Sequence, residues 1–149
     1  MKTAVVYVSS HHGNTKKLVD AIAAAYDITV IDALRERAAD LSGYDRIGFA
    51  SGIAYGKFYP QMLAFMRENL PEGKTVFFLY TYGLKKPGYT DAAAGIAAEK
   101  NCLLSGEYGC LGYDTFSLLK IVGGIAKGHP NEREIAAAVK FYEQLSEEV

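Results

Sequence analysis

The sequence predicts a doubly wound α/β domain, in which helices cover both faces of a five-stranded parallel sheet. Half of the 149 residues are apolar, which is enough to form one substantial core. Short apolar runs alternate along the chain with segments of helical periodicity. Strands that alternate with helices are joined by right-handed crossovers, and such connections make the sheet parallel. We therefore expect a single domain that spans residues 1–149.

The first half of the chain contains three of the expected strands. The run TAVVYVS at Thr3–Ser9 is apolar enough for a strand buried within a sheet. Thr15–Tyr26 follows it with apolar residues on one helical face, as in a helix that lies on a sheet. Ile28–Asp32 and Arg46–Ser51 have the composition of the next two strands, and a weaker helical pattern at 33–39 predicts a helix between them.

The second half continues the alternation. The segment QMLAFMREN spaces its large apolar residues as one helix face, and a further helix is expected at Ala92–Lys100. Thr75–Thr81 is rich in β-branched and aromatic residues, which favours a strand. The fifth strand is expected at Cys102–Cys110, although its glycines weaken that pattern.

The last helix is marked by the residues at its N-terminus. Asn131 follows a proline and has Glu134 three residues on, an arrangement typical of a helix N-cap. The apolar face of this helix carries Ile135, Val139 and Tyr142. The segment 111–130 before it is irregular and rich in glycine, so we expect a long connection there.

Charge and composition exclude several classes of function. The formal net charge of -1, from 16 basic and 17 acidic residues, provides no electrostatic surface for nucleic acid or an anionic membrane. No apolar run approaches the ~20 residues of a membrane span, and the N-terminus lacks the features of a signal peptide. Cys102 and Cys110 lie too far apart on one strand to form a disulfide. We therefore expect a cytoplasmic protein with no nucleic acid partner and no membrane insertion.

The junction at Ser9–Thr15 is the first candidate for a binding site. In doubly wound sheets, ligands lie at the carboxyl ends of strands where the winding reverses, and the first strand borders that point. The helix that follows offers unpaired backbone N–H groups and the positive end of its dipole. Gly13 allows the chain to turn, while Ser10, Asn14 and Thr15 can add side-chain hydrogen bonds. The sequence therefore predicts a phosphate-binding loop made mostly of neutral donors.

Other phosphate and nucleotide sites fit the chain less well. It lacks both the lysine-bearing GxxxxGKS/T loop and a GxGxxG motif after the first strand. A phosphorelay receiver would need acidic residues after the first strand and an aspartate at the end of the third, where this chain has serines and a glycine. A thiol phosphatase would need a cysteine in the first loop. A metal site at His11 and His12 is disfavoured because adjacent side chains diverge and no third ligand lies nearby.

Three segments of the chain resemble the flavodoxins. The first loop of that family follows the pattern Ser or Thr, any residue, Thr, Gly, any residue, Thr. SHHGNT at Ser10–Thr15 matches this pattern except that His12 replaces a threonine. ASGIAYGKFY at Ala50–Tyr59 and GYDTFSLLKIVGGIAKGHPNEREI at Gly112–Ile135 also resemble short-chain flavodoxin-domain proteins. The resemblance covers essentially the whole chain, and it implies a flavodoxin-like sheet in the order 2-1-3-4-5, bound FMN, and transfer of one or two electrons.

Two other strand-end loops suit a flat aromatic ring beside that phosphate. Their glycines permit close backbone approach, and Tyr55 and Tyr82 can stack on an isoalloxazine ring. By resemblance, a carbonyl of the Ser51–Gly56 loop accepts a hydrogen bond from reduced flavin N5 and stabilises the semiquinone. The residues expected to bind FMN are Ser9, Ser10, His11, His12, Gly13, Asn14, Thr15, Ser51, Gly52, Ile53, Ala54, Tyr55, Gly56, Thr81, Tyr82 and Gly83.

Two classes of function remain open, and the sequence favours the first. One is an electron carrier whose FMN shuttles electrons between partner proteins, a reductase and an acceptor. The other is an FMN-dependent NAD(P)H:quinone-type reductase. Nearly neutral charge weakens the carrier hypothesis, since family carriers are usually strongly acidic, and so does the missing Gly-Pro pair after Asp114-Thr115. The reductase hypothesis is weakened because the chain has no nicotinamide fingerprint and no evident catalytic acid or base. A domain that has lost FMN is disfavoured by the intact Gly13, Asn14 and Thr15.

Overall fold

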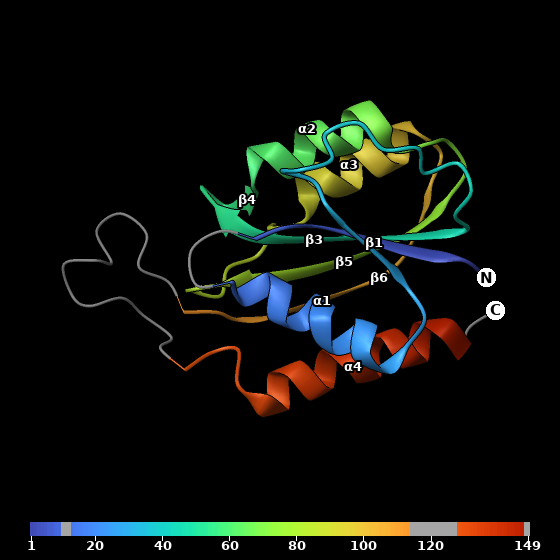
Figure 1. Ribbon diagram of the computed structural model, residues 1–149. Helices are drawn as coiled ribbons and strands as arrows, with labels where there is room; N and C mark the ends of the chain where they lie inside the picture. The colour runs from blue at the N-terminus through green and yellow to red at the C-terminus, as the bar shows by residue number, and fades with distance from the viewer. Residues whose placement is uncertain (10–12, 114–127, 148–149) are drawn as a thin grey trace.

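The sheet has the parallel architecture that the sequence predicts. The computed structural model describes residues 1–9, 13–113 and 128–147 (Figure 1). The parallel strands run in the order β2-β1-β3-β5-β6, and each neighbouring pair is parallel. In chain order this is the expected 2-1-3-4-5, so the fold prediction is confirmed. The strands are β1 (Thr3–Val8), β2 (Thr29–Asp32), β3 (Arg46–Ala54), β5 (Thr75–Tyr82) and β6 (Leu103–Leu111).

Helices cover both faces of this sheet. In Figure 1, α1 (Asn14–Ala25) and α4 (Glu132–Glu147) lie below the sheet, while α2 (Pro60–Asn69) and α3 (Asp91–Glu99) lie above it. Strand alternation divides the core accordingly. Val6 of β1 belongs to the buried cluster with α2 and α3, and its neighbour Val5 belongs to the cluster with α1 and α4. Among the described helices, none combines the length and apolarity that crossing a membrane requires.

The expected helix at 33–39 is wrong, because this connection consists of turns. A carboxylate oxygen of Asp32 accepts a hydrogen bond from the N–H of Leu34 at 3.0 Å, so the chain turns as it leaves β2. The side chain of Asn69, at the end of α2, then binds two backbone groups of the connection. It donates to the carbonyl of Arg37 at 2.8 Å and accepts from the N–H of Ala39 at 3.1 Å. The N–H of Ala39, which a helix over 33–39 would have paired with the carbonyl of Arg35, is thus bound by a side chain instead.

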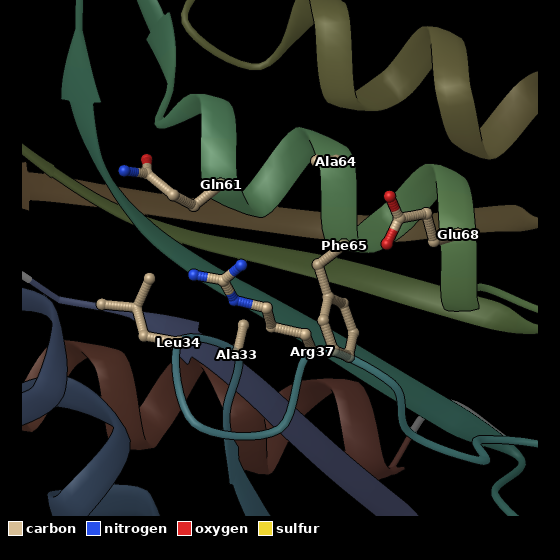
Figure 2. A pocket seen from close by; sticks show the side chains of 7 residues that line it. All are labelled: Ala33, Leu34, Arg37, Gln61, Ala64, Phe65 and Glu68. Carbon is tan, nitrogen blue, oxygen red and sulfur yellow. The ribbon is translucent and has the colours of Figure 1, made fainter.

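A pocket of about 250 Å³ lies between this connection and α2 (Figure 2). Its apolar part includes the buried side chains of Ala33 and Phe65. Arg37 from the connection and Glu68 from α2 bring opposite charges to its rim. The pocket therefore occupies part of the face that a helix after β2 was expected to cover.

Strand β3 is longer than the sequence indicates. The apolar pattern suggested an end at Ser51, whereas the strand continues to Ala54. It then turns at Tyr55-Gly56 into the short strand β4 (Lys57–Phe58), which pairs with it antiparallel. The segment expected to be a strand-end loop is thus mostly a β-hairpin.

Candidate functional site

The predicted site residues that the structure describes gather at the carboxyl edge of the sheet. The parallel register places Val8 beside Ser51, and Gly52 beside Thr81. The chain therefore leaves β1, β3 and β5 at one edge of three adjacent strands. Ser10, His11 and His12 lie outside the described residues, so their predicted role stays a prediction.

The N-terminus of α1 has the features of an anion-binding site. Gly13 adopts φ 68°, a left-handed conformation that glycine accepts without steric cost, and α1 starts at Asn14. The first turn of α1 contains no acidic residue and has no side-chain cap at Gly13. The hydroxyl of Ser9 accepts from the N–H of Lys16 at a long 3.4 Å. The first N–H groups of a helix lack intrahelical acceptors, so this turn presents neutral donors and a positive dipole to an anion.

Asn14 and Thr15 are buried, and each joins α1 to another part of the edge. The amide nitrogen of Asn14 donates to the carbonyl of Tyr113 at 2.7 Å. The hydroxyls of Thr15 and Thr81 lie 3.0 Å apart and share a hydrogen bond, which ties α1 to the end of β5. Oδ1 of Asn14 is buried and has no hydrogen-bond partner within the described part of the chain. This orphaned acceptor, beside a helix terminus rich in donors, fits a bound group that carries both phosphate and hydroxyl functions.

The β3–β4 hairpin projects an exposed tyrosine at the same edge. Tyr55 and Gly56 adopt φ 53° and 79°, the two positive values that a two-residue type I′ turn requires. The side chain of Tyr55 is 86% exposed. A tyrosine in this conformation is uncommon, and unusual backbone conformations of this kind concentrate at functional sites. Tyr55 is thus placed where a planar ligand at the edge could contact it.

Ser51 and Gly52 support this hairpin from within the core. Ser51 is fully buried, and its hydroxyl donates to the carbonyl of Gly52 at 2.7 Å and accepts from the N–H of Tyr59 at 3.1 Å. A Cβ at Gly52 would lie 2.4 Å from the hydroxyl of Tyr59. The side chain of Ser51 therefore holds the start of α2 against β3, and its predicted contact with FMN stays a prediction.

A cluster of three tyrosines lies at the carboxyl end of β5, with two in the strand and one in the loop after it. Tyr80 and Tyr82 lie on one side of the strand, with ring centroids 6.0 Å apart, and Tyr89 lies 6.3 Å and 5.8 Å from them. The hydroxyl of Tyr89 donates to the carbonyl of Leu84 and so fixes the loop between them. Burial raises the pKa of Tyr80 and Tyr82, which keeps both phenols protonated near neutral pH. The sequence missed Tyr80 and Tyr89; the i, i+2 spacing of Tyr80 and Tyr82 was the available signal.

No group of three His, Cys, Asp or Glu side chains that could hold a metal occurs among residues 1–9, 13–113 and 128–147. Cys102 and Cys110 are both free thiols. Cys110 is buried, and burial together with nearby Glu134 raises the pKa of its thiol to about 12. A thiol of this kind is protonated at neutral pH and is a poor nucleophile.

Comparison with known proteins agrees with this fold. A model of the flavodoxin domain matches residues 5–117. An uncharacterized protein of Methanocaldococcus jannaschii is 31% identical over 147 residues, which cover 97% of this chain and 98% of that protein.

Three solved structures share the fold at identities below 25%. Flavodoxin 2 from Bacillus cereus, in its oxidised form, is 16% identical with a TM-score of 0.70, over 100% of both chains. A flavodoxin from the domain Archaea is 21% identical with a TM-score of 0.68, over 98% of this chain and 99% of that chain. An NADH:FMN oxidoreductase in its apo form is 14% identical with a TM-score of 0.63, over 99% of this chain and 89% of that chain. With a domain match over residues 5–117 and a sheet in the flavodoxin order, the chain belongs to the flavodoxin-domain family.

Proposed function

We propose that this protein binds FMN at the carboxyl edge of its sheet and carries electrons between redox partners. The observation that carries the proposal is the N-terminus of α1, which combines backbone N–H groups without intrahelical acceptors, a first turn without acidic residues and the orphaned Oδ1 of Asn14. FMN, when bound, would supply a centre that accepts one or two electrons. The residues of the chain would bind and orient the FMN.

Different residues would bind the phosphate and the isoalloxazine ring of FMN. Backbone N–H groups at Asn14 and Thr15, with the hydroxyl of Ser9, would hold the phosphate. Tyr55 on the hairpin and Tyr82 at the end of β5 would flank the ring from two adjacent strand ends. Backbone N–H groups suit this task because they bind an anion without a charged side chain, so the binding does not depend on the protonation of such a side chain.

The exposed residues beside these loops suit contact with a partner protein. Leu84 is an exposed apolar residue, and Lys57, Lys85 and Lys86 surround the two loops. None of the three lysines forms an ion pair with another described residue. Free positive charges around an apolar centre fit a partner with acidic groups at its own docking face.

The charge of this surface can be measured with a small oxidant. The rate at which ferricyanide oxidises the reduced protein should fall as salt rises, because Lys57, Lys85 and Lys86 beside the candidate ring site attract this anion and salt screens the attraction. The double variant Lys85→Glu/Lys86→Glu should reverse that salt dependence. Lys140→Glu, an exposed lysine on α4, provides the matched control and should leave it unchanged. A rate that rises with salt in the unmodified protein would contradict a positively charged surface beside the candidate ring site.

The second candidate is an FMN-dependent reductase that uses NAD(P)H. The fold match to an NADH:FMN oxidoreductase and the nearly neutral charge favour it. Stepwise reduction of the FMN-loaded protein separates the two candidates. A stable one-electron state favours the carrier, whereas rapid two-electron reduction by NAD(P)H alone favours the reductase. A protein that stays colourless with saturating FMN would refute both.

The phosphate site is tested by a charge placed at Gly13. Gly13→Asp should weaken FMN binding by at least about tenfold, since a carboxylate about 4 Å from a phosphate of charge about −2 costs about 2 kcal/mol even at the dielectric constant of water. Riboflavin, which lacks the phosphate, should bind almost as before. Gly13→Asn is the matched control, because Asn has the same shape, tolerates positive φ and carries no charge. Equal losses for FMN and riboflavin would show that the phosphate lies elsewhere.

A further inference from the structure

Glu134, in the first turn of α4, uses both carboxylate oxygens to join two separate segments. Oε1 lies 2.5 Å from Nδ1 of His129 and accepts from the N–H of Asn131 at 2.8 Å. Oε2 accepts from the N–H of Leu111 at 3.3 Å. The side chain of Glu134 is only 19% exposed. We call Glu134, Leu111 and His129 the Glu134 clasp, because their contacts fasten the end of β6 to the turn before α4.

The Glu134 clasp is connected to the candidate phosphate site by a short series of hydrogen bonds. The carbonyl of His129 accepts from the N–H of Tyr113 at 2.8 Å. The carbonyl of Tyr113 in turn accepts from the amide nitrogen of Asn14 at 2.7 Å. Asn14 is the first residue of α1, and this contact spans 99 residues of sequence. The N–H and the carbonyl of Tyr113 therefore connect the Glu134 clasp to the N-terminus of α1.

The adjacent residue links the same strand end to the candidate ring site. The N–H of Gly112 donates to the carbonyl of Tyr82 at 2.9 Å. A Cβ at Gly112 would lie 2.7 Å from Nδ2 of Asn14, so the backbone here is packed directly against that side chain. Displacement of residues 111–113 would thus move both Asn14 and its only described hydrogen-bond acceptor.

Helix capping explains only part of this arrangement. Asn131 and Glu134 exchange reciprocal hydrogen bonds, as in a capping box, and these confirm the predicted start of α4. Capping does not require the contacts with Leu111 and His129, which reach back to β6. Glu132 lies in the same helical turn and is exposed. Helix dipole effects act on both glutamates, so the contacts to β6 distinguish Glu134.

We propose that Glu134 is a positioning residue for phosphate binding, acting through Tyr113 and Asn14 to hold the N-terminus of α1 in place. This inference rests on the proposed FMN function. Without the carboxylate, Leu111 and His129 lose their common partner, and the Tyr113 carbonyl is no longer fixed opposite Asn14. The effect should fall on the phosphate of the ligand more than on its ring.

The test compares FMN with riboflavin in three variants. Glu134→Ala should weaken FMN binding about tenfold and riboflavin binding by less than about threefold. Glu132→Ala removes the same charge from the same turn, and it should change neither affinity. Asn131→Ala removes the cap that accepts from Glu134 N–H and keeps the carboxylate, so it should lower Tm without changing the ratio of the two affinities. If Glu134→Ala does not fold, Glu134→Gln provides the same comparison, because an amide has a single acceptor oxygen and cannot accept from both Leu111 and Asn131 as the carboxylate does.

Hydrogen exchange of the cofactor-free protein provides an independent measurement. Amide exchange at residues 13–17 should be faster in Glu134→Ala and unchanged in Glu132→Ala and Asn131→Ala. Unchanged exchange, or equal weakening of FMN and riboflavin, would overturn the proposal. If the unmodified protein binds neither ligand, the proposed FMN function fails, and hydrogen exchange alone then decides whether the Glu134 clasp holds α1.

Discussion

Gly112 should tolerate no larger residue, because it lies against the buried side chain of Asn14. A Cβ at this position would lie 2.7 Å from Nδ2, 2.9 Å from Cγ and 3.0 Å from Cβ of Asn14. All three distances are shorter than the 3.4 Å at which ordinary van der Waals contact begins. Two of the atoms are close to the backbone of α1, so a side-chain rotation alone cannot relieve the overlap. Gly112→Ala must therefore move the start of α1 or the end of β6.

The free-energy cost follows from what that movement breaks. Asn14 is 9% exposed, and its amide nitrogen donates to the carbonyl of Tyr113 at 2.7 Å. Leaving a buried donor unpaired costs about 1–3 kcal/mol, and forcing a side chain off its rotamer costs about 0.5–1.5 kcal/mol. We expect Gly112→Ala to lower the free energy of unfolding by about 2 kcal/mol. For a chain of this size that corresponds to a decrease in Tm of about 4–8 °C.

Thermal unfolding and ligand titration together test this expectation. Circular dichroism should report the lower Tm, and fluorescence titration should show FMN affinity reduced about tenfold, with a smaller loss for riboflavin. Gly43→Ala is the matched control, since Gly43 is exposed and no atom lies within 4 Å of the added Cβ. It should change the free energy of unfolding by less than ~0.5 kcal/mol. Wild-type Tm and FMN affinity in Gly112→Ala would refute the reasoning, because Asn14 would then accommodate the methyl group without loss.

Two further predictions concern Tyr55 and Cys110. Tyr55→Asn should stabilise the cofactor-free protein by about 0.5–1 kcal/mol in denaturant unfolding, since Asn tolerates the left-handed φ of this turn. The same variant should weaken FMN and riboflavin equally, and a loss confined to FMN would contradict a contact with the ring. For Cys110, whose pKa is raised from 9.0 to about 12, the thiol is favoured in the folded state, so stability is retained below about pH 9 and decreases as pH rises toward 12. Cys110→Ser should flatten that decrease in pH-dependent unfolding, and an unchanged slope would assign it to other groups.

Sequence reasoning succeeded where the determining interactions are local. The start of α4 was predicted from Asn131 and Glu134, and these two residues do exchange capping hydrogen bonds. The parallel sheet followed from alternation and right-handed crossovers, and the strand order 2-1-3-4-5 was implied by the resemblance to the flavodoxins. Convergence of the loops after β1, β3 and β5 followed from that order alone.

Sequence reasoning failed where a side chain distant in sequence determines the backbone conformation. The connection at 33–39 has a weak helical pattern, but Asn69 at the end of α2 binds its backbone and keeps it in turns. The β3–β4 hairpin was missed for another reason. Type I′ turns favour Asn-Gly, and a Tyr-Gly pair gives little signal for one. The alternation of exposed Lys57 and buried Phe58 after Gly56 was the remaining indication of a strand.

The polar side chains at the candidate site are used mainly to join elements rather than to face a ligand. Thr15 binds Thr81, Asn14 binds Tyr113, and Ser51 binds the backbone of Tyr59. Each contact connects two different elements, the first two of them far apart in sequence, and takes a donor or acceptor away from the binding surface. An anion at α1 would therefore depend chiefly on backbone N–H groups, whose positions these contacts fix. It follows that affinity should respond more to residues that shift the backbone, such as Gly112, than to loss of a single polar side chain that faces the ligand.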